Sequence, residues 1–288
     1  MTERRFQGCR TEHVGVSHSE SRSDWVAAEE PLEIQVVPEG GAPHPIAVTM
    51  RTPGHDAELA VGFLVGEGLL RSPSDVAEVS LRVPRPGEQV RVVLRPGVPF
   101  DAARFERHVY TTSSCGVCGK TSLQALELQE FPPVADAAWE LDAALVRDLP
   151  RRLREAQAVF ERTGGLHAAG IFGLDGHAMT VREDVGRHNA VDKAAGERFL
   201  AGAWPLREAV LVVSGRASFE LVQKALASGI PMLVAVGAPS SLAVETAERF
   251  GLTLVGFTRA DGFNIYAGGR RVRQDRPSAA PLPAEIPA

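Results

Sequence analysis

The chain is poor in cysteine, in aromatic residues and in net charge. Its 288 residues include 3 cysteines and 6% aromatic residues, and 31 Lys and Arg against 36 Asp and Glu give a net charge of −5. Three cysteines are too few for a disulfide scaffold, and such a count is typical of a reducing compartment. The near balance of charge argues against a nucleic-acid-binding surface that extends over the whole protein.

Long apolar runs are also absent. The N-terminus is charged and leads into a polar stretch, unlike the apolar core of a signal peptide. The densest apolar run, Ile230 to Ala238, contains Pro231 and Gly237. It is much shorter than the roughly 18–20 residues that span a bilayer. We therefore expect a buried strand there, and a cytoplasmic protein without a membrane segment.

Composition divides the chain into four parts. Residues 1–25 are polar and without periodicity, which predicts a disordered leader, and the Pro- and Ala-rich residues 274–288 predict a disordered tail. Residues 26–100 predict a smaller β-rich N-terminal region with one helix, Asp56 to Leu70. Alternation of polar and apolar residues favours antiparallel strands there. The expected strands are Leu32–Val37, Ile46–Met50, Val79–Val83 and Val90–Leu94.

Residues 101–273 predict an α/β domain. Three apolar strands, Ala209–Val213, Met232–Val236 and Leu252–Phe257, alternate with two helical stretches. Strands that are apolar on both faces and separated by helices pair in parallel, with helices covering the sheet. The expected architecture is therefore a three-layer α/β domain.

Two cysteines carry the strongest chemical signal. Cys115 and Cys118 lie three positions apart in a glycine-rich loop, directly before Lys120 and a helix expected from Thr121. A lysine and a helix N-terminus both lower the pKa of a thiol. The loop therefore predicts covalent sulfur chemistry, either a persulfide carrier or a dithiol–disulfide exchanger.

Other interpretations of the cysteine pair remain open or fail. Thioredoxin-like redox chemistry uses the same spacing, and a structural zinc site needs about four ligands, for which no second Cys or His pair follows. Coincidence is a further alternative. The resemblance of the loop to a phosphate-binding P-loop fails, because Ser114 stands where that motif needs glycine.

A second cluster, Arg182 to Lys193, is dense in charge. If a helix begins near Val185, Asp184 caps it, and Asp184, His188 and Asp192 share one face. The alternative is a solvated helix face with local ion pairs.

Three loops follow the parallel strands. They are Ser214–Ser218, Gly237–Ser241 and Thr258–Gly262. In open α/β sheets, phosphates bind at such loops, where helix N-termini present free N–H groups. Arg216 and Arg259 suit phosphate contacts, and Asp261 suits a guanine edge or a ribose. Together the loops predict a phosphate-bearing ligand.

These motifs, in this order, resemble the formate dehydrogenase accessory sulfurtransferases, the FdhD sulfur carriers. The resemblance extends from Glu30 to Tyr266 and is carried by three motifs: Cys115–Gly119, Arg182–Lys193 and Ser214–Glu220. It implies a carrier that accepts sulfane sulfur from a cysteine desulfurase and transfers it to the molybdenum or tungsten bis-guanine-dinucleotide cofactor of formate dehydrogenase. It also implies a fold similar to that of cytidine deaminases, and a homodimer.

The resemblance assigns roles to residues. Cys115 would hold the persulfide, and Cys118 would be its partner in relay or release. Contacts to the cofactor, and to a nucleotide such as GDP, are expected from Phe257, Thr258, Arg259, Ala260, Asp261 and Gly262, with Arg187, His188, Ser214 and Arg216 as further candidates. No resident metal, nucleic acid or membrane partner is expected. Deaminase chemistry is excluded, because Ser114 replaces the proline of the deaminase zinc motif and no His-x-Glu precedes it.

Two functions of other classes remain as alternatives. One is a non-catalytic chaperone that holds the cofactor during maturation of formate dehydrogenase. The other is a zinc-stabilised nucleotide-binding protein.

Overall fold

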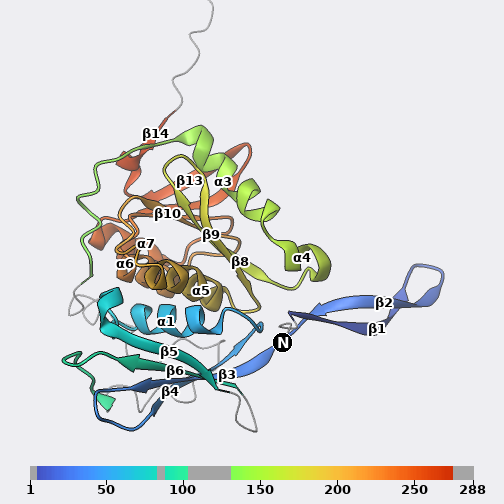
Figure 1. Cartoon of the computed structure of the whole chain (residues 1–288). Helices are drawn as coiled ribbons and strands as arrows, with labels where there is room; N and C mark the ends of the chain where they lie inside the picture. Colours follow the sequence, from blue (N-terminus) through green and yellow to red (C-terminus); the bar gives the residue numbers. More distant parts are fainter. Residues whose placement is uncertain (1–4, 83–87, 103–130, 275–288) are drawn as a thin grey trace, which may run out of the picture.

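The computed structural model describes residues 5–82, 88–102 and 131–274, which form a mixed α/β structure (Figure 1). Its strands are β1 (Phe6–Val14), β2 (Ser19–Ala27), β3 (Glu30–Val37), β4 (His44–Arg51), β5 (Val76–Arg82), β6 (Glu88–Leu94), β7 (Leu141–Asp142), β8 (His167–Gly173), β9 (Ala178–Asp184), β10 (Ala209–Val213), β11 (Met232–Ala235), β12 (Thr253–Arg259), β13 (Gly262–Ala267) and β14 (Val272–Arg273). Its α-helices are α1 (Asp56–Gly66), α3 (Ala143–Glu155), α4 (Ala158–Thr163), α5 (Arg187–Leu200), α6 (Phe219–Ala227) and α7 (Ser241–Phe250).

The β-rich region is a four-stranded sheet in the order β4-β3-β6-β5. The four expected strands are confirmed, but antiparallel pairing holds only for the hairpins β3–β4 and β5–β6, because β3 and β6 pair in parallel. The cause is the helix α1, which connects the two hairpins and brings β6 alongside β3 in the same direction. The helix ends at Gly66 rather than Leu70, because Gly68 takes a positive φ of 71° and turns the chain.

The second sheet has six strands in the order β13-β12-β11-β10-β8-β9. The parallel pairing of β10, β11 and β12 is confirmed. Two antiparallel strands, β8 and β13, flank this parallel core. The start of β8 and the end of β9 therefore lie at the same edge as the carboxyl ends of the parallel strands.

Apolar packing arranges the elements in layers (Figure 1). One core lies between α1 and the four-stranded sheet, a second between the six-stranded sheet and the helices α5, α6 and α7, and a third between that sheet and α3. The expectation that helices cover both faces of the parallel strands is confirmed. The closer likeness to cytidine deaminases stays a prediction.

The prediction of a disordered leader is wrong for residues 6–25. The strands β1 and β2 form an antiparallel hairpin that projects from the body of the molecule (Figure 1), with nine paired positions from Phe6↔Ala27 to Val14↔Ser19. At its base the rings of Phe6 and Trp25 meet edge to face at 5.3 Å. Most side chains on both faces of the hairpin are exposed, so no apolar alternation marks these strands in the sequence.

Two further expectations, the helix from Thr121 and the tail beyond Gln274, lie outside the described residues. Among the residues that are described, no helix is long and apolar enough to cross a membrane.

Candidate functional site

The loops that follow β10, β11 and β12 form one continuous edge of the sheet, which we call the rim. The amide of Gly237 donates to the carbonyl of Gly215 at 2.9 Å, and the amide of Phe257 donates to the carbonyl of Gly237 at 3.1 Å. A side chain at Gly237 would be crowded, since a Cβ there would lie 3.1 Å from the backbone of Arg216. The expectation that the three loops lie side by side is thus confirmed.

The stretch from Phe257 to Gly262 forms the end of β12 and the turn into β13. Phe257 has a φ of 52° and is 43% exposed, and Arg259, Ala260 and Asp261 are exposed beside it. Thr258 is only 1% exposed, and its Oγ1 has no hydrogen-bond partner in the described part of the chain. These residues therefore present an aromatic ring, a guanidinium and a carboxylate at the end of the rim.

Two helix N-termini meet at the rim. Neither Gly186, at the start of α5, nor Ser218, at the start of α6, caps its helix with a side chain, whereas Ser240 caps α7 through the amide of Ala243. The Nε2 atom of His188 lies 3.2 Å from Ser218 Oγ and 2.6 Å from Glu220 Oε2. This contact joins the first turns of α5 and α6, and uncapped helix N-termini attract anions.

His167 is a rim residue that the sequence analysis missed. It begins β8 beside Gly215, where a Cβ would lie 3.4 Å from His167 Nδ1. Burial, followed by the charges of Arg187 and His188, lowers the pKa of His167. Its neutral imidazole can therefore donate one hydrogen bond and accept another. A histidine that opens an apolar strand was the available signal.

Most of the further candidates gather here. Arg187 and His188 occupy the first turn of α5, and Ser214 holds the start of β8 because its Oγ accepts from the amide of Ala168 at 2.9 Å. The buried Nε of Arg187 has no hydrogen-bond partner among the described residues. Arg216 lies exposed on the rim. Cys115 and Cys118 lie outside the described residues.

The helix α5 is not a solvated charged face. Asn189, Asp192 and Lys193 are all buried, and Asp192 accepts from Lys224 Nζ at 2.6 Å. The helix begins at Arg187 rather than near Val185, so the prediction that Asp184 caps it is wrong, and Gly186 occupies the N-cap position. Asp184 accepts from the amide of Gly186 at 2.8 Å and so fixes the turn into the helix from outside it. The alternative of local surface ion pairs is wrong for these residues.

No group of three or more His, Cys, Asp or Glu side chains that could hold a metal ion occurs among residues 5–82, 88–102 and 131–274. Arg187, Arg216 and Arg259 lie on the rim with the N-termini of α5 and α6, and these groups outnumber the carboxylates of Glu220 and Asp261, so the set suits an anionic ligand.

The Glu58 carboxyl on α1 should make the free energy of unfolding depend on pH in acid. Burial would raise the pKa of Glu58, but hydrogen bonds from His55 and Arg182 outweigh it and lower the pKa from 4.5 to about 2. A lowered carboxyl pKa stabilises the fold above about pH 4.5, and this stability is lost as the pH falls towards 2. In Glu58→Gln we expect the free energy of unfolding, measured in urea, to fall less over that pH range than in the wild type, by at most about 3 kcal/mol. Glu208→Gln, at an exposed glutamate, is the control and should leave the pH profile unchanged; an equal effect of both would contradict the assignment.

The chain matches known proteins over most of its length. Residues 27–273 match the model of the FdhD/NarQ family. The Streptomyces coelicolor protein named "Sulfur carrier protein FdhD" is 51% identical over 259 residues, which cover 88% of this chain and 90% of that protein. The Mycobacterium tuberculosis protein of the same name is 49% identical over 277 residues, covering 91% of this chain and 97% of that protein.

A crystal structure of a formate dehydrogenase accessory protein from Desulfotalea psychrophila has a similar fold. The TM-score is 0.72 at 24% sequence identity, over 93% of this chain and 99% of that one. The family match covers the strand–helix core, the rim and the sequence motif Cys115–Gly119 in one continuous stretch. The chain therefore belongs to the FdhD/NarQ family.

Proposed function

We propose that the protein is a sulfur carrier that activates formate dehydrogenase. It takes sulfane sulfur from a cysteine desulfurase and delivers it to the molybdenum or tungsten bis-guanine-dinucleotide cofactor, which is its substrate. The observation that carries the proposal is the rim, where two uncapped helix N-termini meet beside Arg187 and His167. The names of the relatives support the sulfur-carrying step.

The sulfur step needs two thiols. The Cys115 thiolate attacks the outer sulfur of the desulfurase persulfide; a new S–S bond forms at Cys115, and the desulfurase cysteine leaves as a thiolate. Attack of the Cys118 thiolate on Cys115 Sγ then forms a disulfide and releases the outer sulfur with both bonding electrons, as sulfide, to the acceptor. External thiols reduce the disulfide before the next cycle.

The rim supplies the contacts for a guanine dinucleotide. Phosphates suit the first turns of α5 and α6, where Arg187 adds a positive charge, and Arg259 suits a phosphate at the end of β12. The exposed Phe257 ring offers a stacking face, and the Asp261 carboxylate can accept from the guanine edge. A homodimer that docks on formate dehydrogenase completes the proposal.

Persulfide loading tests the sulfur step. Incubation with a cysteine desulfurase and cysteine, followed by intact mass measurement, is expected to show a one-sulfur adduct on the wild type and none on Cys115→Ala. Cys9, in the N-terminal hairpin, provides the matched control, because Cys9→Ala should load like the wild type. Loading of Cys115→Ala would mean that another cysteine accepts the sulfur, and activation of formate dehydrogenase by an unloaded Cys115→Ala would favour a cofactor chaperone instead.

Nucleotide binding tests the placement of the cofactor. Losing a charge-assisted contact to phosphate costs about 1.5–3 kcal/mol, so Arg259→Ala is expected to weaken GDP binding about tenfold or more in calorimetry. Arg273→Ala is the control. Arg271, two residues before Arg273, contacts Gly251 and Thr253 at the start of β12. Arg273 therefore lies near the start of this strand, whereas Arg259 lies at its other end, on the rim. Equal GDP affinity of Arg259→Ala and wild type would show that the nucleotide binds elsewhere.

A further inference from the structure

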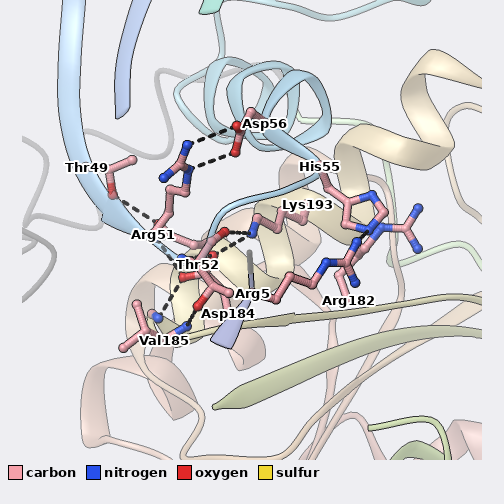
Figure 2. A network of polar contacts seen from close by, with 12 residues as sticks. Arg5, Thr49, Arg51, Thr52, His55, Asp56, Arg182, Asp184, Val185 and Lys193 are labelled. Carbon is pink, nitrogen blue, oxygen red and sulfur yellow. Dashed lines mark hydrogen bonds and ion pairs between the residues drawn. The ribbon is translucent and has the colours of Figure 1, made fainter. Parts of the chain in front are cut away.

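A buried polar cluster lies where the end of β9 and the helix α5 meet the segment that follows β4, and Figure 2 shows Thr52, Asp184 and Lys193 of this cluster. We call it the Asp184 cluster, and its members are Thr52, Asp184, Asn189 and Lys193. Thr52 follows β4, Asp184 ends β9, and the other two lie on α5. The cluster therefore joins the β-rich region to the first turn of α5, which carries Arg187 and His188 at the rim.

The Asp184 carboxylate is fully bonded by four donors from these segments. Its Oδ1 accepts from the amide of Gly186 at 2.8 Å and from Asn189 Nδ2 at 3.0 Å. Its Oδ2 accepts from the amide of Thr52 at 3.1 Å and lies 2.7 Å from Lys193 Nζ. The side chain is 0% exposed, so each donor replaces a water that the carboxylate has lost.

Thr52 uses its backbone and its side chain for the same purpose. Its amide donates to Asp184, its hydroxyl accepts from the amide of Val185 at 3.1 Å, and its carbonyl accepts from Lys193 Nζ at 2.7 Å. The turn from Asp184 to Gly186 is thus held on two sides, by Thr52 and by Asn189. This turn sets the direction in which α5 begins.

Stability alone does not account for a charged pair at this place. Burial lowers the pKa of Lys193, and the Asp184 carboxylate opposes that shift. A buried ion pair often contributes no more stability than apolar side chains of the same volume, while its directional bonds fix the geometry of the groups that it joins. A geometric role also agrees with the neighbouring rim, where ligand contacts need side chains placed to within about 0.5 Å.

We propose that Lys193 and Thr52 are positioning residues for the rim. They hold the Asp184 carboxylate in place, and this carboxylate fixes the turn into α5 and with it Arg187 and His188. The inference rests on the proposed function only in using GDP as the probe of the rim.

Amide hydrogen exchange tests the positioning without any ligand. The amides of Thr52, Val185 and Gly186 donate to side chains of the cluster. In Lys193→Met we expect these three amides to exchange at least about tenfold faster, because the bonds that protect them open locally. The amide of Ala201, bonded to the Glu197 carbonyl at the far end of α5, should keep its rate relative to global unfolding.

Lys224→Met is the matched control. Lys224 lies on α6 and pairs with Asp192, the neighbour of Lys193 on α5. Its loss therefore also leaves a buried carboxylate unpaired, but Lys224 does not contact Asp184. We expect Lys224→Met to lower urea stability as Lys193→Met does, and to leave exchange at the three amides unchanged relative to global unfolding. GDP affinity should fall about tenfold or more in Lys193→Met and stay within about twofold in Lys224→Met.

The outcomes distinguish the positioning role of Lys193 from the placement of the nucleotide on the rim. Equal acceleration of the three amides in both variants, or in neither, would overturn the positioning role. So would wild-type GDP affinity in Lys193→Met. If the wild-type protein binds no GDP, the nucleotide placement fails, and the exchange of the three amides still decides whether Lys193 orders the turn.

Discussion

Gly62→Ala is expected to lower the free energy of unfolding by about 3 kcal/mol or more, at the upper end of overpacking effects. A Cβ at Gly62 of α1 would lie 1.9 Å from the carbonyl oxygen of Asp192 on α5. The contact is reciprocal, since a Cβ at Gly196 of α5 would lie 1.9 Å from the carbonyl oxygen of Glu58. Both obstacles are backbone, so the two helices must move apart to admit a methyl group.

Moving these helices apart would disturb more than their own interface. The helix α1 packs on the four-stranded sheet, and α5 packs on the six-stranded sheet, so the pair of helices joins the two halves of the molecule (Figure 1). The same movement would carry Thr52 away from Asp184, because Thr52 lies just before α1. Loss of GDP binding is therefore expected together with loss of stability.

Gly66→Ala is the control, four residues along the same helix. There the nearest atom to a new Cβ is Lys224 Nζ at 3.0 Å, the end of a flexible side chain. Alanine also favours a helix over glycine by about 1 kcal/mol, which offsets part of any strain. Urea unfolding of both variants measures the difference, and similar stabilities would contradict the close packing of α1 on α5.

The sequence predicted the features that depend on local pattern. The pattern of apolar strands separated by helices predicted the parallel pairing of β10, β11 and β12, and with it the three adjacent loops of the rim. The density of charge from Arg182 to Lys193 correctly marked the start of α5 as unusual. Periodicity and spacing suffice wherever structure follows from neighbours in the chain.

Features that depend on distant segments were not predictable in this way. The Asp184 cluster needs Thr52, which lies 132 residues before its partner in the chain. His167 joins the rim only because β8 runs antiparallel to β10 and so starts at its carboxyl end. The parallel pairing of β3 with β6 likewise depends on the path of α1 rather than on the pattern of either strand.

Arg51→Met is expected to lower the free energy of unfolding by about 3–5 kcal/mol, the cost of leaving the buried carboxylate of Asp56 unpaired. Arg51 is 0% exposed and bonds both oxygens of Asp56, at 2.8 and 3.0 Å (Figure 2). It also bonds Glu88 of β6 and the carbonyl of Glu30 on β3. One guanidinium therefore ties α1 to two strands of the sheet beneath it.

Methionine retains most of the volume of arginine, so the expected loss reflects charge and hydrogen bonds rather than a cavity. The double variant Arg51→Met/Asp56→Asn should recover part of the stability, because it removes one of the unpaired charges.

Arg151→Met is the surface control. Arg151 pairs with Asp148 and Glu155 at 2.6 and 2.5 Å, yet it is exposed to water, which screens the pairs. Chemical denaturation should show little change for Arg151→Met. If Arg51→Met proved equally mild, the carboxylates around it would have to find water or other donors, and the anchoring of α1 through Arg51 would be wrong.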